Sequence, residues 1–135
     1  MPLLEGDASA SFRTLAEASL QALYAAFPPR ATLDGIHDHD GRLGDWSAVG
    51  IAGRTASLRR HLGRLESTVL ETLTEEDRID ALLLGARLRA ELLDLEAVRS
   101  WRRDPGHYCR LISEGIYGVA ALRYDSPQQR LRHAA

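Results

Sequence analysis

The stretch 75-EEDRIDALLLGARLRAELLDLEAVRSW-101 decides the fold class, because apolar residues recur along it with helical spacing. These residues form two stripes. One stripe consists of Ile79, Leu83, Ala86, Ala90, Leu93 and Ala97, and the other of Leu84, Leu88, Leu92 and Leu95. A helix that is apolar over so wide an arc packs against neighbours on two sides. We therefore expect a central helix over residues 75–101, about 40 Å long at 1.5 Å per residue.

Both ends of this helix carry terminal signals. Thr74 followed by Asp77 resembles a capping box, with aspartate in place of glutamate. The acidic turn 75–77 suits the positive end of the helix dipole. At the other end, 101-WRRDP-105 places cationic residues near the negative end and a proline after it.

A first helix is expected over residues 11–27, with Ser9 or Ser11 as its N-cap. Pro28 and Pro29 stop it, because proline disfavours helical continuation. We expect residues 1–10 to be a flexible N-terminus.

A second long helix is expected over residues 48–71, after Ser47 as N-cap. Its apolar positions are Ile51, Leu58, Leu62, Leu65 and Val69. The spacing is heptad-like and favours nearly antiparallel packing. The outer face is basic, with Arg54, Arg59, Arg60, His61 and Arg64. This face could bind phosphates, but we expect it to be solvated or to pair with Glu75, Glu76 and Asp80.

A fourth helix is expected over residues 107–122, where Gly115 and Gly118 would allow close approach of another backbone. Ser126 and Pro127 form an N-cap and first-turn pair for a fifth, short or truncated helix over 126–135. The predicted fold is a single all-α domain over 1–135. It is an antiparallel bundle of four long helices plus the start of a fifth, with a long loop between helices one and two.

Composition restricts the function. The chain has 135 residues, 44% of them hydrophobic, and a net charge of −2, so nucleic-acid binding is not expected. All basic residues besides histidine are arginines, which excludes a Schiff-base, Walker or general-base lysine. The single cysteine, Cys109, cannot form an intrachain disulfide and fits a reducing cytoplasm. No signal peptide or apolar run long enough for a bilayer is visible, so we expect a soluble cytoplasmic protein without membrane contact.

The loop 35-GIHDHDGRLGDWS-47 is the densest cluster of titratable groups. The candidate catalytic residues are His37, His39 and Asp40, and with Asp38 they are also the candidate metal ligands. Imidazoles and carboxylates bind divalent transition metals, and histidine can also act as an acid or base. The alternative is a solvated loop with an Asp40-Gly41 turn. We expect no metal and no cofactor.

Other candidates are ligand-binding side chains, namely Arg42, Asp45, Trp46, Tyr108 and Tyr117. Tyrosines at helical spacing, and tryptophans at helix boundaries, are first interpreted as core residues or lids on the core. Nucleophile elbows, zinc-binding helices and glycine-rich phosphate loops are absent from the sequence.

Three stretches carry a resemblance. They are 12-FRTLAEASLQALYAAFPPRATLDGIHDHDGRLGDWS-47, 73-LTEEDRIDALLLGARLRAELLDLEAVRSWRRDPGHY-108 and 115-GIYGVAALRYDSPQQRLR-132. Most of the match lies from Gly35 to Ser47 and around Asp77, Trp101 and Asp104-Pro105. The chain resembles the N-terminal part of the bacterial domain-of-unknown-function family 885. The resemblance implies a relationship to large helical proteins with a metallopeptidase-like fold.

In the large members, the resemblance implies zinc peptidase chemistry on a His-Glu-x-x-His helix far downstream. That motif is missing here, so a scaffold is implied but catalysis is not. Zinc would bind only if a missing downstream region or a partner supplied ligands.

Three functions stay open. The first is a non-catalytic helical scaffold or substrate-channel domain, which needs a protein partner or self-association to cover exposed helix faces. The second is a small enzyme or ligand-binding protein that uses loop 37–40 for acid–base chemistry or metal binding. The third is an oligomerisation or adaptor bundle. We expect the isolated chain not to be an enzyme; if it is one, it is a hydrolase-like or acid–base helical enzyme.

Overall fold

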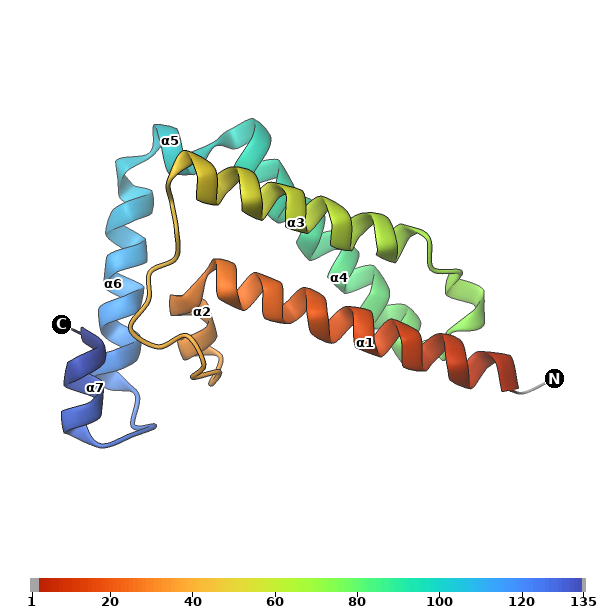
Figure 1. Cartoon of the computed structure of the whole chain (residues 1–135), viewed down its shortest axis with the longest axis horizontal. Helices are drawn as coiled ribbons and strands as arrows, with labels where there is room; N and C mark the ends of the chain where they lie inside the picture. The colour runs from red at the N-terminus through yellow and green to blue at the C-terminus, as the bar shows by residue number, and fades with distance from the viewer. Residues whose placement is uncertain (1–2, 135) are drawn as a thin grey trace. The chain divides into compact units, whose positions relative to one another are not determined.

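The computed structural model describes residues 3–134 and the side chains of residues 7–134, and every regular element in this range is helical. The all-α prediction is therefore confirmed (Figure 1). The α-helices are α1 (Leu3–Ala26), α2 (Pro28–Leu33), α3 (Ala48–Glu66), α4 (Glu75–Leu93), α5 (Ser100–Arg103), α6 (Pro105–Ala121) and α7 (Pro127–Ala134). A 3₁₀ helix, η1 (Leu70–Thr72), precedes α4, and a π-helical turn, η2 (Asp94–Val98), follows it. None of the helices described is long and apolar enough to cross a membrane.

The described chain divides into two compact units. Unit 1 comprises residues 3–22 and 51–98, and unit 2 comprises residues 23–50 and 99–134. The helices α1 and α3 each contribute to both units. The prediction of a single domain stays a prediction.

In unit 1, α3 and α4 run antiparallel. Arg89 of α4 binds Glu66 near the end of α3 at 2.8 Å, while Arg59, earlier on α3, binds Glu96 after α4 at 2.6 Å. Residue numbers thus rise along one helix as they fall along the other, as expected for helices joined by a short connection.

The direction of α1 follows from its contacts with the start of α4. The backbone N–H of Thr74 donates to Ser9 Oγ at 3.1 Å, and Arg13, one turn further along α1, binds Asp77. These contacts make α1 parallel to α4, so α1, α3 and α4 alternate in direction.

The unit 1 core contains only one of the two stripes of α4. Leu84, Leu88, Leu92 and Leu95 are buried. In the other stripe, Ile79, Leu83 and Leu93 are 52%, 63% and 60% exposed. The prediction that α4 packs on two sides is therefore wrong for this stripe.

The predicted helix boundaries need three corrections. The helix α1 already begins at Leu3, so residues 3–10 are helical and Ser9 and Ser11 lie inside the helix instead of capping it, while residues 1–2 lie outside the described range. The helix α3 ends at Glu66 instead of residue 71. The central helix ends at Leu93, where the π-helical turn and a left-handed Arg99 (φ 57°) precede the short α5.

Predicted N-caps are present on α3, α4 and α7. They are Ser47, Thr74 and Ser126. The side-chain oxygen of each accepts a hydrogen bond from the backbone N–H three residues later, at 3.1, 3.2 and 3.2 Å respectively. In a capping box the Asp77 side chain would accept the backbone N–H of Thr74. Here Ser9 Oγ accepts this N–H instead.

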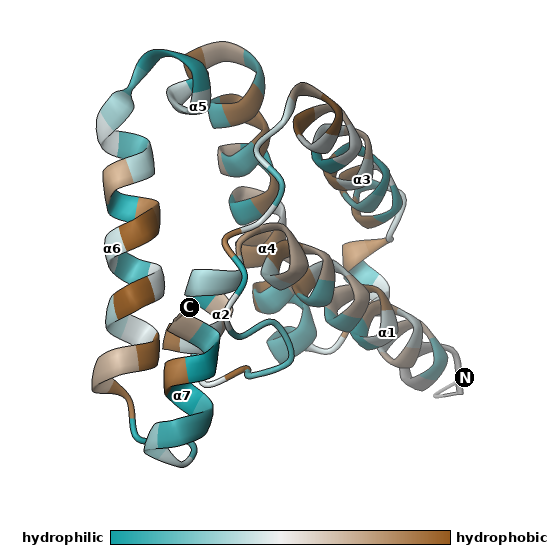
Figure 2. Ribbon diagram, turned by 60° about the vertical axis from the view of Figure 1, so that its left-hand side comes forward, coloured by the Kyte–Doolittle hydropathy of each residue, from teal (hydrophilic) through white to brown (hydrophobic). Residues whose placement is uncertain are grey.

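In unit 2, α2 and α7 both pack on α6, along which hydrophobic residues recur (Figure 2). A Cβ at Gly118 would lie 3.1 Å from Cγ2 of Thr32 in α2, so a side chain packs closely there, whereas the approach of another backbone stays a prediction. Arg130 of α7 donates to carbonyls in the last turn of α6 and just beyond it, including that of Leu122 at 2.9 Å. These bonds satisfy carbonyls that lack a partner within their own helix.

Candidate functional site

The loop after α2 is organised around Asp40, whose side chain is only 3% exposed. The hydroxyl of Thr32 in α2 donates to Asp40 Oδ1 at 2.5 Å. On the other oxygen, His37 Nδ1 lies 3.0 Å from Oδ2. One carboxylate thus ties the loop to α2 and orients one histidine of the HDHD motif.

Tyr124 and His133, both in the C-terminal part of the chain, complete this group. The ring of Tyr124 stacks on the ring of His37, with 3.9 Å between centroids and 16° between planes. Burial, together with the negative charge of Asp40, raises the pKa of Tyr124 to about 12. His133 Nδ1 of α7 lies 4.0 Å from Asp40 Oδ2. We call Thr32, His37, Asp40, Tyr124 and His133 the Asp40 cluster.

The structure does not bring the four side chains of the HDHD motif, residues 37–40, into one group. His37 and Asp40 belong to the Asp40 cluster. Asp38 is exposed, and His39 is half-buried and, among the described residues, forms no side-chain hydrogen bond or ion pair with the cluster. Among the residues described, no group of three or more histidine, cysteine or acidic side chains is placed to hold a metal ion. Sequence spacing did not reveal the contributions of Thr32, Tyr124 and His133, because they come from other elements.

This arrangement has limited chemical capacity. An imidazole held by a carboxylate is oriented for proton transfer through its other nitrogen. The Thr32 hydroxyl donates its hydrogen bond to Asp40 and not to His37, so it is not paired with a base. The contacts favour a loop anchor over a nucleophile–base pair.

Trp46 belongs to a separate aromatic group in unit 2. Its indole Nε1 donates to the Leu43 carbonyl at 2.9 Å. Its ring meets those of Phe27, His107 and Tyr108 edge-on, at 6.1, 4.3 and 6.4 Å. The Tyr108 hydroxyl donates to the Trp101 carbonyl at 2.5 Å. These contacts agree with the interpretation of Trp46 as a lid on the core.

The predicted ligand-binding residues are dispersed. Arg42 lines a pocket of about 380 Å³ in unit 2, together with Thr32, His133 and the apolar Leu43 and Ile112. Asp45 instead accepts the backbone N–H of Ser47 at 2.9 Å. Tyr117 is 61% exposed on α6. Only Arg42 of the five candidates lines this pocket.

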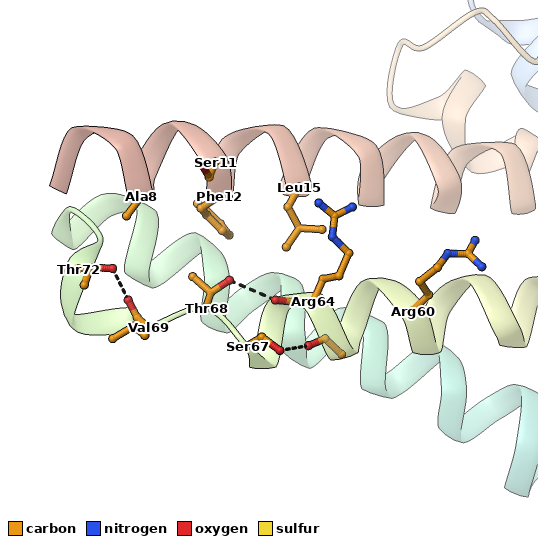
Figure 3. A pocket seen from close by; sticks show the side chains of 11 residues that line it. Ala8, Ser11, Phe12, Leu15, Arg60, Arg64, Ser67, Thr68, Val69 and Thr72 are labelled. Carbon is orange, nitrogen blue, oxygen red and sulfur yellow. Dashed lines mark hydrogen bonds between the residues drawn. The ribbon is translucent and has the colours of Figure 1, made fainter. Parts of the chain in front are cut away.

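A larger groove lies in unit 1, between α1 and the end of α3 (Figure 3). Its volume is about 700 Å³, and Arg60 and Arg64 line it. Beside them, burial and these two positive charges lower the pKa of His61, whose Nδ1 lies 2.9 Å from Ser19 Oγ. The sequence signal for this groove is the basic face of α3, for which the sequence predicts solvation or pairing with the start of α4.

Comparison of the chain with protein-family models, curated proteins and solved structures found no match.

Proposed function

We propose that the chain is a non-catalytic helical scaffold, related to the N-terminal part of the domain-of-unknown-function family 885, which self-associates in the cytoplasm. The observation that carries this proposal is the exposed stripe of α4, with Ile79, Leu83 and Leu93 each more than half exposed. Large apolar side chains aligned along one helix face are typical of interaction surfaces.

The spacing of the stripe supports a helix as the covering element. From Ile79 to Leu93, within α4, the apolar positions are separated by steps of four and three, which is the spacing of a coiled-coil seam. Ala86 and Ala90 lie at the middle of the seam, where small side chains let a second backbone approach. A second copy of the chain is the proposed occupant, because closed homo-oligomers are the commonest soluble assemblies and present the same seam twice.

The antiparallel bundle of four long helices is also retained as a proposal. The alternating directions of α1, α3 and α4 support it, because an up-and-down bundle needs this alternation.

The Asp40 cluster fits a scaffold. The Thr32 hydroxyl and His37 both use their polar atoms on one buried carboxylate, so the HDHD loop is anchored to α2. This is a structural role that requires neither substrate nor metal.

Sedimentation velocity over a range of concentrations tests self-association. We expect the wild-type chain, 14.9 kDa as a monomer, to form a larger species as concentration rises. Leu83→Glu should abolish that species, because a carboxylate in the seam would be desolvated. Leu131→Glu on α7 is the matched control, since Leu131 is 70% exposed outside the stripe and should leave assembly intact. A monomer at every concentration would rule self-association out.

A second candidate is a ligand- or metal-binding protein, favoured by the His37–Asp40 pair, whose cluster partners Thr32 and His133 line the 380 Å³ pocket. Metal analysis of protein prepared without chelator tests it. This candidate predicts that His37→Ala removes bound metal while His39→Ala retains it, because only His37 contacts Asp40. Identical metal content in the wild type and both variants would eliminate it.

A further inference from the structure

The groove of unit 1 has an apolar floor and a polar rim. Phe12 and Leu15 of α1 lie at the floor and are 3% and 4% exposed. Val69, after α3, is 58% exposed at the other wall. The volume of about 700 Å³ lies within the range of small-ligand sites. Because Phe12 and Leu15 are almost fully covered, the apolar surface that a ligand can reach is mainly that of Val69.

Two arginines line the groove on successive turns of α3. Figure 3 shows the Arg64 side chain reaching toward α1, beside Leu15, while Arg60 extends from the preceding turn. Like charges four residues apart on a helix repel each other. An anion between the two guanidinium groups would relieve this repulsion.

Arg60 and Arg64 differ from other arginines of unit 1 in their ion pairing. Other arginines of the unit bind carboxylates, in the pairs Arg13–Asp77, Arg59–Glu96, Arg78–Glu75, Arg87–Glu91 and Arg89–Glu66. Among the side chains described, no carboxylate lies within ion-pair distance of Arg60 or Arg64, and Arg60 contacts only the Ser57 hydroxyl, at 3.5 Å. The groove therefore concentrates positive charge that no described acidic side chain of the same unit neutralises.

The rim hydroxyl groups after α3, those of Ser67, Thr68 and Thr72, are already used as donors. Ser67 donates to the Gly63 carbonyl at 2.9 Å, and Thr72 donates to the Val69 carbonyl at 2.7 Å (Figure 3). Each oxygen keeps lone pairs that can only accept. Hydrogen bonds to an oxyanion can therefore come from the guanidinium groups, which match planar oxyanions with two parallel bonds, and from the exposed Ser11 hydroxyl.

We propose that this groove binds a small organic oxyanion, with its phosphate or carboxylate between Arg60 and Arg64 and a short apolar body against Val69. The ligand site is independent of the α4 stripe and goes beyond the scaffold function.

NMR titration of the full chain with phenyl phosphate tests the site. We expect amide shifts confined to residues 8–15 and 60–72. Inorganic phosphate lacks the apolar body and benzyl alcohol lacks the anion, so both should bind more weakly. Benzoate distinguishes the head groups: tighter binding of phenyl phosphate supports a phosphate ligand, and tighter binding of benzoate supports a carboxylate. Shifts outside the groove for every probe, or inorganic phosphate binding as tightly as phenyl phosphate, would overturn the proposal.

Substitutions separate specific contacts from general charge. Arg64→Gln should weaken phenyl phosphate binding by about tenfold, since it removes charge-assisted hydrogen bonds. Arg78→Gln is the matched control, because it removes the same charge from α4 outside the groove and should leave binding unchanged. Equal weakening by both variants would show non-specific attraction and would contradict the site.

Arg64→Lys keeps the proposal testable if glutamine disturbs the fold. It preserves the charge but removes the planar fork, so we expect intermediate affinity. Amide spectra without ligand verify that each variant is folded. A double variant, Arg60→Gln with Arg64→Gln, that is folded and still binds phenyl phosphate like the wild type would refute the site.

Discussion

Arg13 of α1 donates its Nε–H to Oδ1 of Asp77 in α4 at 2.9 Å, so the first turn of α4 is anchored to α1. Asp77 is only 3% exposed. Its other oxygen accepts the Thr74 hydroxyl at 2.9 Å. The hydrogen bond from Arg13 is the main reason that the pKa of Asp77 falls from 3.8 to about 2.

This lowered pKa predicts a pH-dependent contribution to stability. Ionised Asp77 stabilises the fold fully above the unfolded pKa of 3.8, and the contribution disappears as the pH falls toward the folded pKa of about 2. Asp77→Asn should therefore lower the melting temperature by roughly 5 °C at pH 7. The difference from the wild type should narrow between pH 4 and pH 2, as measured by circular dichroism.

Asp80→Asn is the control for Asp77→Asn. Asp80 is an exposed carboxylate on the same helix, so its loss should change the melting temperature little. If Asp77→Asn melts like the wild type at pH 7, the link between α1 and α4 does not contribute to stability.

Two leucines of α4 should respond differently to the same truncation. Leu88 is fully buried, so Leu88→Ala should lower the free energy of unfolding by about 3 kcal/mol. Leu83 is 63% exposed, so at concentrations where the chain is monomeric Leu83→Ala should change it by less than about 0.5 kcal/mol. Urea denaturation of dilute protein measures both. Similar losses would mean that the exposed stripe is buried within one chain.

The N-caps of α3, α4 and α7 are the part of the fold that local chemistry predicts best. Ser47, Thr74 and Ser126 all cap their helices, because a cap depends on a side chain and an N–H three residues away. Ser9 was misassigned for the opposite reason. It has a capping side chain, but it lies inside α1 and accepts an N–H from Thr74, distant in sequence.

Burial and site composition depend on distant contacts, which periodicity does not encode. The two stripes of α4 look equivalent in sequence, yet only that of Leu88 is buried. Likewise, the HDHD motif contains Asp40 but does not indicate which side chains contact its carboxylate. Thr32 and Tyr124 reach it only because α2 and the segment before α7 pack nearby.

Removing the charge of Asp40 should loosen the loop. Asp40→Asn exchanges a buried acceptor of two hydrogen bonds for a weaker, neutral one, so we expect a loss of about 1–2 kcal/mol in the stability of unit 2. Hydrogen exchange should show faster opening in residues 36–41 and in α7. His39→Ala is the matched control and should leave exchange unchanged, because among the described residues no hydrogen bond, ion pair or ring contact joins the His39 side chain to the Asp40 cluster. Faster exchange in both variants would argue against a specific role for Asp40.

Gly115 and Gly118 of α6 should differ in their tolerance of alanine, and the distance from the new Cβ to its nearest atom does not by itself predict which is more tolerant. A Cβ on Gly115 would lie 2.7 Å from Leu43 Cδ2, and one on Gly118 would lie 3.1 Å from Thr32 Cγ2. Leu43 is 41% exposed and can rotate away. Thr32 is 3% exposed and is held by its bond to Asp40, so it cannot. Gly118 is therefore the less tolerant position, although its new Cβ would have the longer distance to its nearest atom.

Alanine in place of glycine favours a helix by about 1 kcal/mol. Gly115→Ala should therefore be neutral or mildly stabilising, whereas Gly118→Ala should lose about 1 kcal/mol net, since overpacking outweighs the helical gain. Gly53→Ala in α3 has open space around the new methyl group and should show the helical gain alone. Thermal denaturation of the three variants gives the order Gly53→Ala, Gly115→Ala, Gly118→Ala from most to least stable. A Gly118→Ala variant more stable than the wild type would mean that α2 can move away from α6.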